Sequence, residues 1–134
     1  MINKSVLYFC NMKYIALLLI PSLFVSCYQI ERNCNDFKTG TYKSKITIDG
    51  IIYKSTFSRD SLLQVESFEG TVDSTYVRWI NNCEVVFKTI NPKNRAEKKD
   101  IHLKILTTSE DSYSFEYGYV GDTYKRQGEA TRIN

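Results

Sequence analysis

Thr41–Ser58 reads TYKSKITIDGIIYKSTFS and contains the pattern that decides the fold. Asp49-Gly50 at its centre is a strong signal for a two-residue type I′ turn, because that turn needs positive φ at both central positions. Such a turn pairs residues whose numbers sum to 99, which fixes the side chains that share a face. One face then holds, in facing pairs, Tyr42 and Phe57, Ser44 and Ser55, Ile46 and Tyr53, and Ile48 and Ile51. The other face holds Lys43, Lys45, Thr47, Ile52, Lys54 and Thr56. The geometry of the turn and the polarity of the two faces indicate the same register, so we expect an antiparallel hairpin here.

The same period-2 alternation recurs along the rest of the chain, with turn residues between the runs. Further strands are predicted at Leu62–Ser67, Thr75–Ile80, Cys83–Ile90, Ile101–Thr107, Ser112–Val120 and Tyr124–Ile133. Within the last of these, Gly128 and Ala130 would let the strand bend or close. About eight short strands predict an all-β, antiparallel up-and-down meander, forming a small lipocalin-like barrel or a half-barrel. The interior of an eight-stranded barrel is just filled by side chains or holds one small ligand.

The N-terminal segment, residues 1–26, contains no Asp or Glu and has a single apolar run, Tyr14–Val25. This run is too short to cross a bilayer core, for which a helix needs about 20 residues. Lys13, the apolar run and the small residues after it are typical of a secretory signal peptide. We expect residues 1–26 to be removed, with translation starting at Met12 or with Met1–Asn11 as an extended n-region.

The end of this segment, Phe24-Val25-Ser26-Cys27, resembles the lipobox of bacterial lipoproteins, in which apolar and small residues precede an invariant Cys. Phe24 stands where the family usually has Leu, and Leu23 lies beside it. The resemblance implies that Cys27 takes a diacylglyceryl thioether and becomes the mature N-terminus. The alternative is a cysteine that follows an ordinary signal peptide by coincidence. Two or more acyl chains anchor a protein stably where one is marginal.

The predicted organisation is therefore a signal peptide over 1–26, a lipidated tether over 27–36 and a β-barrel-like domain over 37–134. The lipid would hold the protein in the cell envelope of a bacterium. We expect it on the periplasmic side of the outer membrane.

Composition narrows the function classes. The 134 residues carry 18 Lys and Arg against 15 Asp and Glu, and 43% are hydrophobic. These values exclude a disordered polyampholyte and an integral membrane protein, and the length excludes a large multidomain enzyme. Without residues 1–26 the net charge falls to +1, because Lys4 and Lys13 are lost. Nucleic-acid-binding domains typically have a strongly basic face, so no nucleic acid partner is expected.

Cys34 and Cys83 are the cysteines that remain once Cys10 is removed and Cys27 is acylated. An exported chain folds in a compartment that favours disulfides. Cys34 precedes the first predicted strand and Cys83 begins the fifth, and odd strands of a meander start at the same end. We therefore expect a bridge, with two isolated thiols as the alternative. No metal is expected, since the chain has one His and no Cys-x-x-Cys or His-x-His spacing.

No catalytic constellation emerges from the sequence. A Ser/His/Asp or Cys/His set needs a histidine beside the nucleophile, and the only histidine, His102, is predicted to face solvent among lysines. Glu110-Asp111 fits a turn better than a cation site. The loop Pro92–Lys99 mixes basic and acidic residues, and no helix follows Gly118–Gly121 to complete a phosphate site. We expect no enzymatic activity and no cofactor.

Aromatic side chains are the most informative feature of the predicted domain, because residues 27–134 contain 14 of them. Core packing explains most aromatic residues, but buried Tyr hydroxyls need hydrogen-bond partners. Several on one inner face would therefore line a partly polar cavity. The predicted ligand-lining residues are Tyr42, Tyr53, Phe57, Trp79, Phe87, Phe115 and Tyr117.

Four short motifs extend over much of the domain: Asp36–Tyr42 (DFKTGTY), Arg59–Ser61 (RDS), Arg78–Glu84 (RWINNCE) and Gly121–Thr123 (GDT). They resemble a family of short exported bacterial lipoproteins, and the resemblance covers nearly all of residues 27–134. It implies no established activity. Some such chains carry the label "DNA topoisomerase IV", which we expect not to apply here. Strand passage needs a catalytic Tyr in a helical DNA-binding domain and an acidic metal cluster in a far longer chain.

The function predicted from the sequence is that of a non-enzymatic, lipid-anchored envelope protein whose barrel binds a small ligand or an envelope protein. The alternative is a protein-interaction module, such as an inhibitor or assembly factor, that acts through its exposed loops. A cavity inside the barrel favours the first function. A filled barrel with an exposed aromatic patch favours the second.

Replacing Cys27 by Ser should abolish acylation, because serine offers no thiol for the thioether, and should release the protein from membranes. Metabolic labelling with a fatty-acid analogue and membrane fractionation measure both effects. Cys10→Ser is the matched control and should keep the label. A Cys27→Ser protein that stays in the membrane fraction would contradict the predicted anchor.

Overall fold

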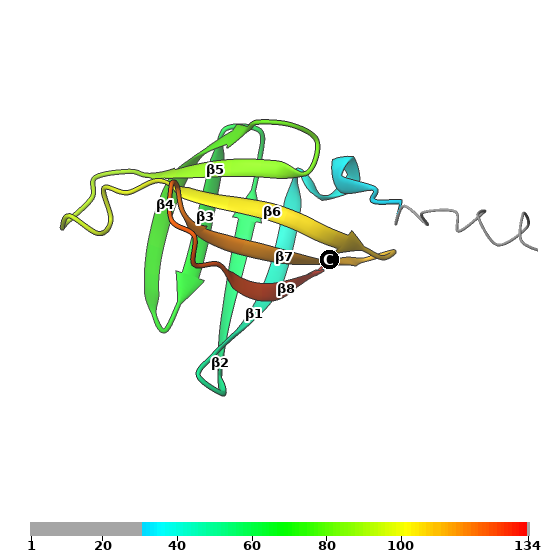
Figure 1. Cartoon of the computed structure of the whole chain (residues 1–134), viewed down its shortest axis with the longest axis horizontal. Coiled ribbons are helices and arrows are strands. Elements are labelled where there is room, and N and C mark those ends of the chain that lie inside the picture. The colour runs from blue at the N-terminus through cyan, green and yellow to red at the C-terminus, as the bar shows by residue number, and fades with distance from the viewer. Residues whose placement is uncertain (1–30, 134) are drawn as a thin grey trace, which may run out of the picture. The chain divides into compact units, whose positions relative to one another are not determined.

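The computed structural model describes residues 31–133, which form a short 3₁₀ helix, η2 (Cys34–Phe37), and a closed antiparallel barrel (Figure 1). Cys27 and the predicted signal peptide lie outside the described residues. The barrel strands are β1 (Gly40–Ile48), β2 (Ile51–Arg59), β3 (Leu63–Phe68), β4 (Thr71–Trp79), β5 (Glu84–Thr89), β6 (Ile101–Thr108), β7 (Ser112–Tyr119) and β8 (Arg126–Arg132). Each strand pairs with its neighbours in the chain and β8 pairs with β1. The predicted meander is confirmed, and it is a closed barrel, not a half-barrel.

The β1–β2 hairpin has the predicted register. Its pairs run from Gly40–Arg59 to Ile48–Ile51, and every pair sums to 99. Asp49 and Gly50 have φ of 51° and 79°, the positive values that the two-residue turn requires. The alternating side chains separate as expected: the lysines of both strands are exposed, and the opposite face is buried away from the turn and partly buried toward it, up to the exposed Ile51.

The predicted start of the fourth strand, Thr75, is wrong by four residues, because β4 begins at Thr71. A second tight turn, at Glu69 and Gly70 with φ of 48° and 79°, joins β3 to β4 directly. The first residues of β4 are mostly exposed, since this end of the hairpin extends beyond the core. Without a buried face these residues show no apolar alternation, which is why the pattern did not reveal them.

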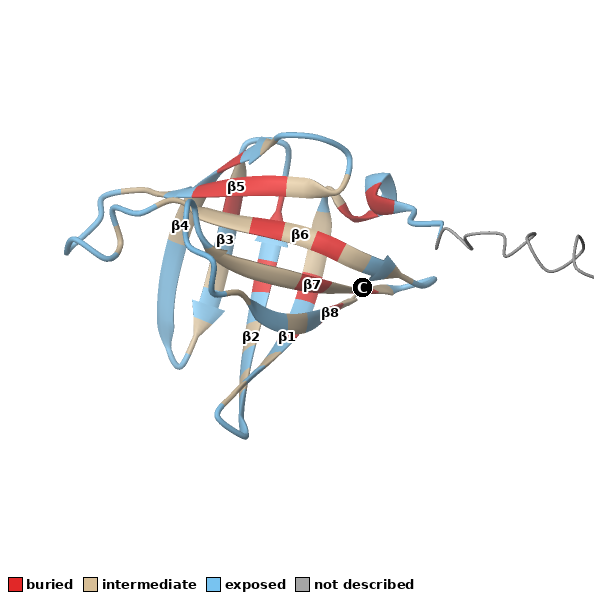
Figure 2. Cartoon of the chain, viewed as in Figure 1, coloured by how far each residue is buried: buried red, intermediate tan, exposed pale blue. Residues whose placement is uncertain are grey.

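The helix η2 closes one end of the barrel. Cys34 and Phe37 are buried in the main core, and the Phe37 ring lies 5.3 Å from the Tyr113 ring. The Arg132 guanidinium at the end of β8 lies 5.3 Å from the Phe37 ring. Every strand contributes at least one buried residue and β5 contributes three, whereas the tips of the long hairpins are exposed (Figure 2). We call the η2 side the closed end.

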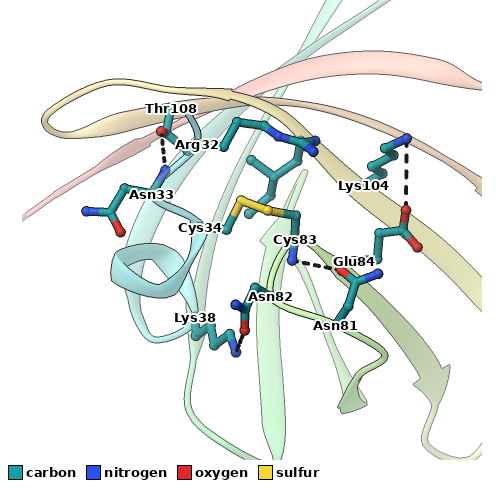
Figure 3. Close-up of a disulfide and its surroundings, with 11 residues drawn as sticks. Arg32, Asn33, Cys34, Lys38, Asn81, Asn82, Cys83, Glu84, Lys104 and Thr108 are labelled. Atoms are coloured by element: carbon teal, nitrogen blue, oxygen red, sulfur yellow. Dashed lines mark hydrogen bonds and ion pairs between the residues drawn. A yellow bond between two sulfur atoms is a disulfide. The ribbon is translucent and has the colours of Figure 1, made fainter. Parts of the chain in front are cut away.

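A disulfide joins Cys34 to Cys83, with 5.2 Å between the Cα atoms, as predicted (Figure 3). Around it, the Asn33 backbone amide donates to Thr108 Oγ1 at 2.9 Å, and the Arg32 guanidinium donates to the Ile105 carbonyl at 2.8 Å. The last residues of the predicted tether therefore belong to the folded unit. The chain enters the barrel at its closed end.

Barrel closure depends on the seam between β1 and β8, where pairing runs from Tyr42–Arg132 to Ile46–Gly128. A Cβ on Gly128 would lie 2.7 Å from the Phe115 ring and 2.8 Å from the Lys45 carbonyl oxygen. Ala130, in the same seam, is completely buried. Small residues at these positions let β8 approach β1, which gives the predicted role of Gly128 and Ala130 a steric reason.

Reduction of the disulfide should lower the free energy of unfolding by about 4 kcal/mol, the chain-entropy value for a closed loop of about 50 residues. Urea unfolding with and without reductant measures the difference. The double variant Cys34→Ala/Cys83→Ala should match the reduced protein and ignore reductant. Free thiols that react with an alkylating agent in the exported, unreduced protein would contradict the bridge.

Substituting Gly128 by Val should destabilise the barrel by about 3 kcal/mol, since an overpacked side chain forces the seam apart. Gln127→Val is the matched control: Gln127 is the exposed neighbour on the same strand, and its substitution should change stability by less than about 0.5 kcal/mol. Melting temperatures of the two variants compare them directly. Equal melting temperatures would mean that the seam does not limit closure.

Candidate functional site

The barrel interior contains a cavity of about 130 Å³. Its walls combine the inward faces of several strands, and its apolar lining residues are Ile46, Phe57, Phe87, Ile101, Leu103, Phe115 and Tyr117. An engineered protein cavity of about 150 Å³ binds benzene, so a space of this size accepts an aromatic ring or a short alkyl chain.

A wider hollow of about 400 Å³ adjoins the cavity at the end opposite η2, and we call it the mouth. The cavity and the mouth share Ile46, Glu66 and Tyr117 as lining residues. The mouth exists because β2 pairs with β3 only from Thr56 to Arg59, which leaves Ile51–Ser55 paired with β1 alone. The β1–β2 and β3–β4 hairpins diverge beyond that point (Figure 1).

A third hollow, of about 230 Å³, lies beside the β7–β8 loop and shares Ile101 and Tyr117 with the cavity. Tyr124 and Arg126 also line it. Burial raises the pKa of the Tyr117 hydroxyl, and the neighbouring Arg126 guanidinium acts in the opposite direction. Tyr117 borders all three spaces and therefore stands between the cavity and both hollows.

A row of polar side chains crosses the cavity wall on three adjacent strands. Arg59 on β2 pairs with Gln64 on β3, and Gln64 pairs with Thr75 on β4. All three residues line the cavity. Arg59 Nε donates to Gln64 Oε1 at 2.7 Å, and Arg59 Nη2 donates to the Tyr113 hydroxyl at 3.3 Å. These bonds hold the guanidinium inside the barrel, where Arg59 is only 3% exposed.

The Arg59 charge lies among aromatic rings instead of carboxylates. Its guanidinium carbon is 5.0 Å from the Phe57 ring, 5.2 Å from Phe87 and 5.7 Å from Trp79. Cation–π contacts of this kind stabilise a desolvated cation. In residues 31–133 no carboxylate forms an ion pair with Arg59, since the pairs found there all involve Glu84.

Hydrogen-bonding capacity in this row is left unused. Within the part of the chain that the structure describes, Arg59 Nη1 and Thr75 Oγ1 are buried and make no hydrogen bond. Burial raises the pKa of the Tyr113 hydroxyl, although the neighbouring Arg59 charge acts in the opposite direction. The phenol is therefore neutral at physiological pH and retains a proton to donate. Arg59, Thr75 and Tyr113 together offer donors to one cavity, an arrangement that can hold an acceptor group or an anion.

Glu66 is the acidic residue of the cavity wall. Its Oε1 accepts a hydrogen bond from Ser55 Oγ at 2.5 Å, and Ser55 Oγ lies 2.7 Å from Ser44 Oγ. Glu66 follows Gln64 by two positions on β3 and also lines the mouth. The acidic group is thus on the mouth side of the polar row.

The predicted lining residues occupy three places. Phe57, Phe87, Phe115 and Tyr117 line the cavity. Tyr53 lines the mouth. Tyr42 is completely buried in the core, where its hydroxyl donates to the Thr39 carbonyl at 2.7 Å. Trp79 packs against that core, and its indole N–H has no hydrogen-bond partner among residues 31–133.

Sequence reasoning missed the polar row of Arg59, Gln64 and Thr75 and its partner Tyr113. A signal for Arg59 was present, because it follows Phe57 by two positions in β2 and so shares its inward face. Gln64 and Thr75 could be placed only after β3 and β4 were aligned with β2.

The other chemical candidates of the sequence lie away from the cavity. His102 on β6 lies opposite Val86 on β5, and its Nε2 is 3.5 Å from the carboxylate of Glu84, also on β5. No group of three or more His, Cys, Asp or Glu suited to a metal ion occurs in residues 31–133. The same residues contain no helix of the length and apolarity that crossing a membrane requires.

Comparison with known proteins gives no relative: no family model, curated protein or solved structure matches this chain.

Proposed function

We propose that this chain is a lipid-anchored cell-envelope protein that binds a small, mostly apolar ligand inside its barrel and leaves it chemically unchanged. The observation that carries the proposal is the cavity and its continuity with the mouth. Protein interiors are normally close-packed, with few voids larger than a water molecule. A ring-lined cavity that continues into a wide opening is typical of ligand sites in the mouths of β-barrels.

The anchor rests on the sequence around Cys27, and the fold is compatible with it. Because the disulfide holds Cys34 at the closed end, the chain enters the barrel on the side opposite the mouth.

A specific observation favours the alternative, a protein-interaction module. Exposed apolar side chains are found at the hairpin tips and in the β7–β8 loop, namely Ile51, Ile52, Val72, Val120 and Tyr124. Exposed apolar patches often mark sites of protein contact. In this second function the tips would contact an envelope protein, and the cavity would have no ligand of its own.

Binding of a neutral fluorescent probe, N-phenyl-1-naphthylamine, tests the first function. Residues 31–133 contain all the strands of the closed sheet and its core. The binding assay can therefore use a chain that begins at residue 28, which lacks Cys27 and its proposed lipid and so needs no detergent. We expect one probe per chain. Ser44→Leu should weaken binding by about tenfold or more, because the new side chain occupies the cavity that buries the ligand. Lys43→Leu adds the same side chain on the outer face of β1 and should leave the affinity unchanged.

Circular dichroism and melting temperature verify that both variants are folded. Saturable binding that both variants retain would place the probe outside the cavity and favour the protein-interaction module. If the wild-type protein binds neither this probe nor 1-octanol, the proposed cavity function is wrong.

A further inference from the structure

The buried charge of Arg59 is the feature of the cavity that packing alone does not explain. A charge taken out of water is costly unless a partner compensates it. In the described residues Arg59 has hydrogen bonds to Gln64 and Tyr113 and aromatic neighbours, but no carboxylate in an ion pair. A buried cation with no ion-pair partner among residues 31–133 leaves its charge available to an anion supplied by a ligand.

The donors beside Arg59 indicate where that counterion binds. Within the described residues, Arg59 Nη1 and Thr75 Oγ1 are buried without a hydrogen bond, and Tyr113 has a neutral hydroxyl with a proton to donate. All three side chains line the same cavity. Arginine presents its N–H groups in a planar fork that suits carboxylates, and a bond to an ionised acceptor is stronger than one between neutral groups.

Glu66 does not supply the counterion. Its carboxylate accepts from Ser55 and makes no ion pair with Arg59 in the structure. Glu66 lies toward the mouth. When the anionic group of a ligand reaches Arg59, the apolar part of that ligand therefore lies beside Glu66. The rings of Phe57, Phe87 and Phe115 line the cavity that this apolar part would occupy.

We propose that the ligand is an amphiphile with a carboxylate, which enters head first and binds Arg59 with help from Thr75 and Tyr113, while its apolar chain fills the cavity and extends into the mouth. This inference rests on the proposed function and adds the chemical class of the ligand. Trp79, the only tryptophan of the chain, lies 5.7 Å from Arg59 and can report on occupancy by its fluorescence.

Three probes with the same chain and different head groups test the inference at neutral pH: octanoate, 1-octanol and n-octylamine. Trp79 fluorescence and isothermal titration of the chain from residue 28 give the affinities. We expect octanoate to bind about tenfold or more tighter than 1-octanol, because only the carboxylate gains charge-assisted bonds. n-Octylamine should bind weakest, since its ammonium group would meet the Arg59 cation.

Arg59→Met keeps an unbranched side chain and removes the charge, so the preference for octanoate over 1-octanol should disappear while 1-octanol still binds. Arg78→Met, an exposed arginine on β4, is the matched control and should keep the preference. If Arg59→Met does not fold, Thr75→Val and Tyr113→Phe each remove one donor and keep the shape. Each should weaken octanoate binding by about fivefold and leave 1-octanol binding unchanged.

The outcomes separate the two proposals. Three results would overturn the carboxylate site while the cavity function stands. The first is equal affinity for octanoate and 1-octanol, and the second is a preference for n-octylamine. The third is a preference for octanoate that survives in Arg59→Met and in both donor variants. Absence of binding by all three probes would overturn the cavity function itself.

Discussion

The pairing of β8 with β1 is the constraint on which the rest of this structure depends. Closure gives every strand two neighbours, removes the exposed edges that invite aggregation, and creates an inside that alternate residues must fill. It requires β8 to lie close to β1, and Gly128 and Ala130 are the small residues that permit this approach. Once the sheet is closed, the interior volume follows from the strand number and stagger, so any mismatch with the side chains becomes a cavity.

The two ends of the barrel differ in how closely their side chains pack. At the closed end the disulfide, the Phe37 ring and the Arg132 guanidinium pack against a core of buried aromatic residues. At the other end the hairpins diverge, and empty volume replaces packed side chains. Contacts that stabilise the fold are thus concentrated away from the mouth, which lets the mouth depart from close packing without loss of the barrel.

Inside the barrel, Arg59 likewise departs from what stability alone would favour. A sequence selected for stability alone would place an apolar residue at this inward position, because burying a cation costs free energy. The surrounding rings and the bonds to Gln64 and Tyr113 reduce that cost without removing it. Departures from packing rules of this kind are expected at functional sites.

By itself the sequence determined the local and pairwise features of this protein. Asp49-Gly50 predicted the β1–β2 register, and the meander order predicted that Cys34 and Cys83 would meet; both depend on short-range rules of turn geometry and strand direction. Only the tertiary structure decided that the meander is closed, that Tyr42 belongs to the packed core, and that Arg59 faces a cavity. The reason is physical: charged residues near a strand end are usually solvated, and an empty volume is what remains after side chains from many strands have packed, which no single stretch of sequence contains.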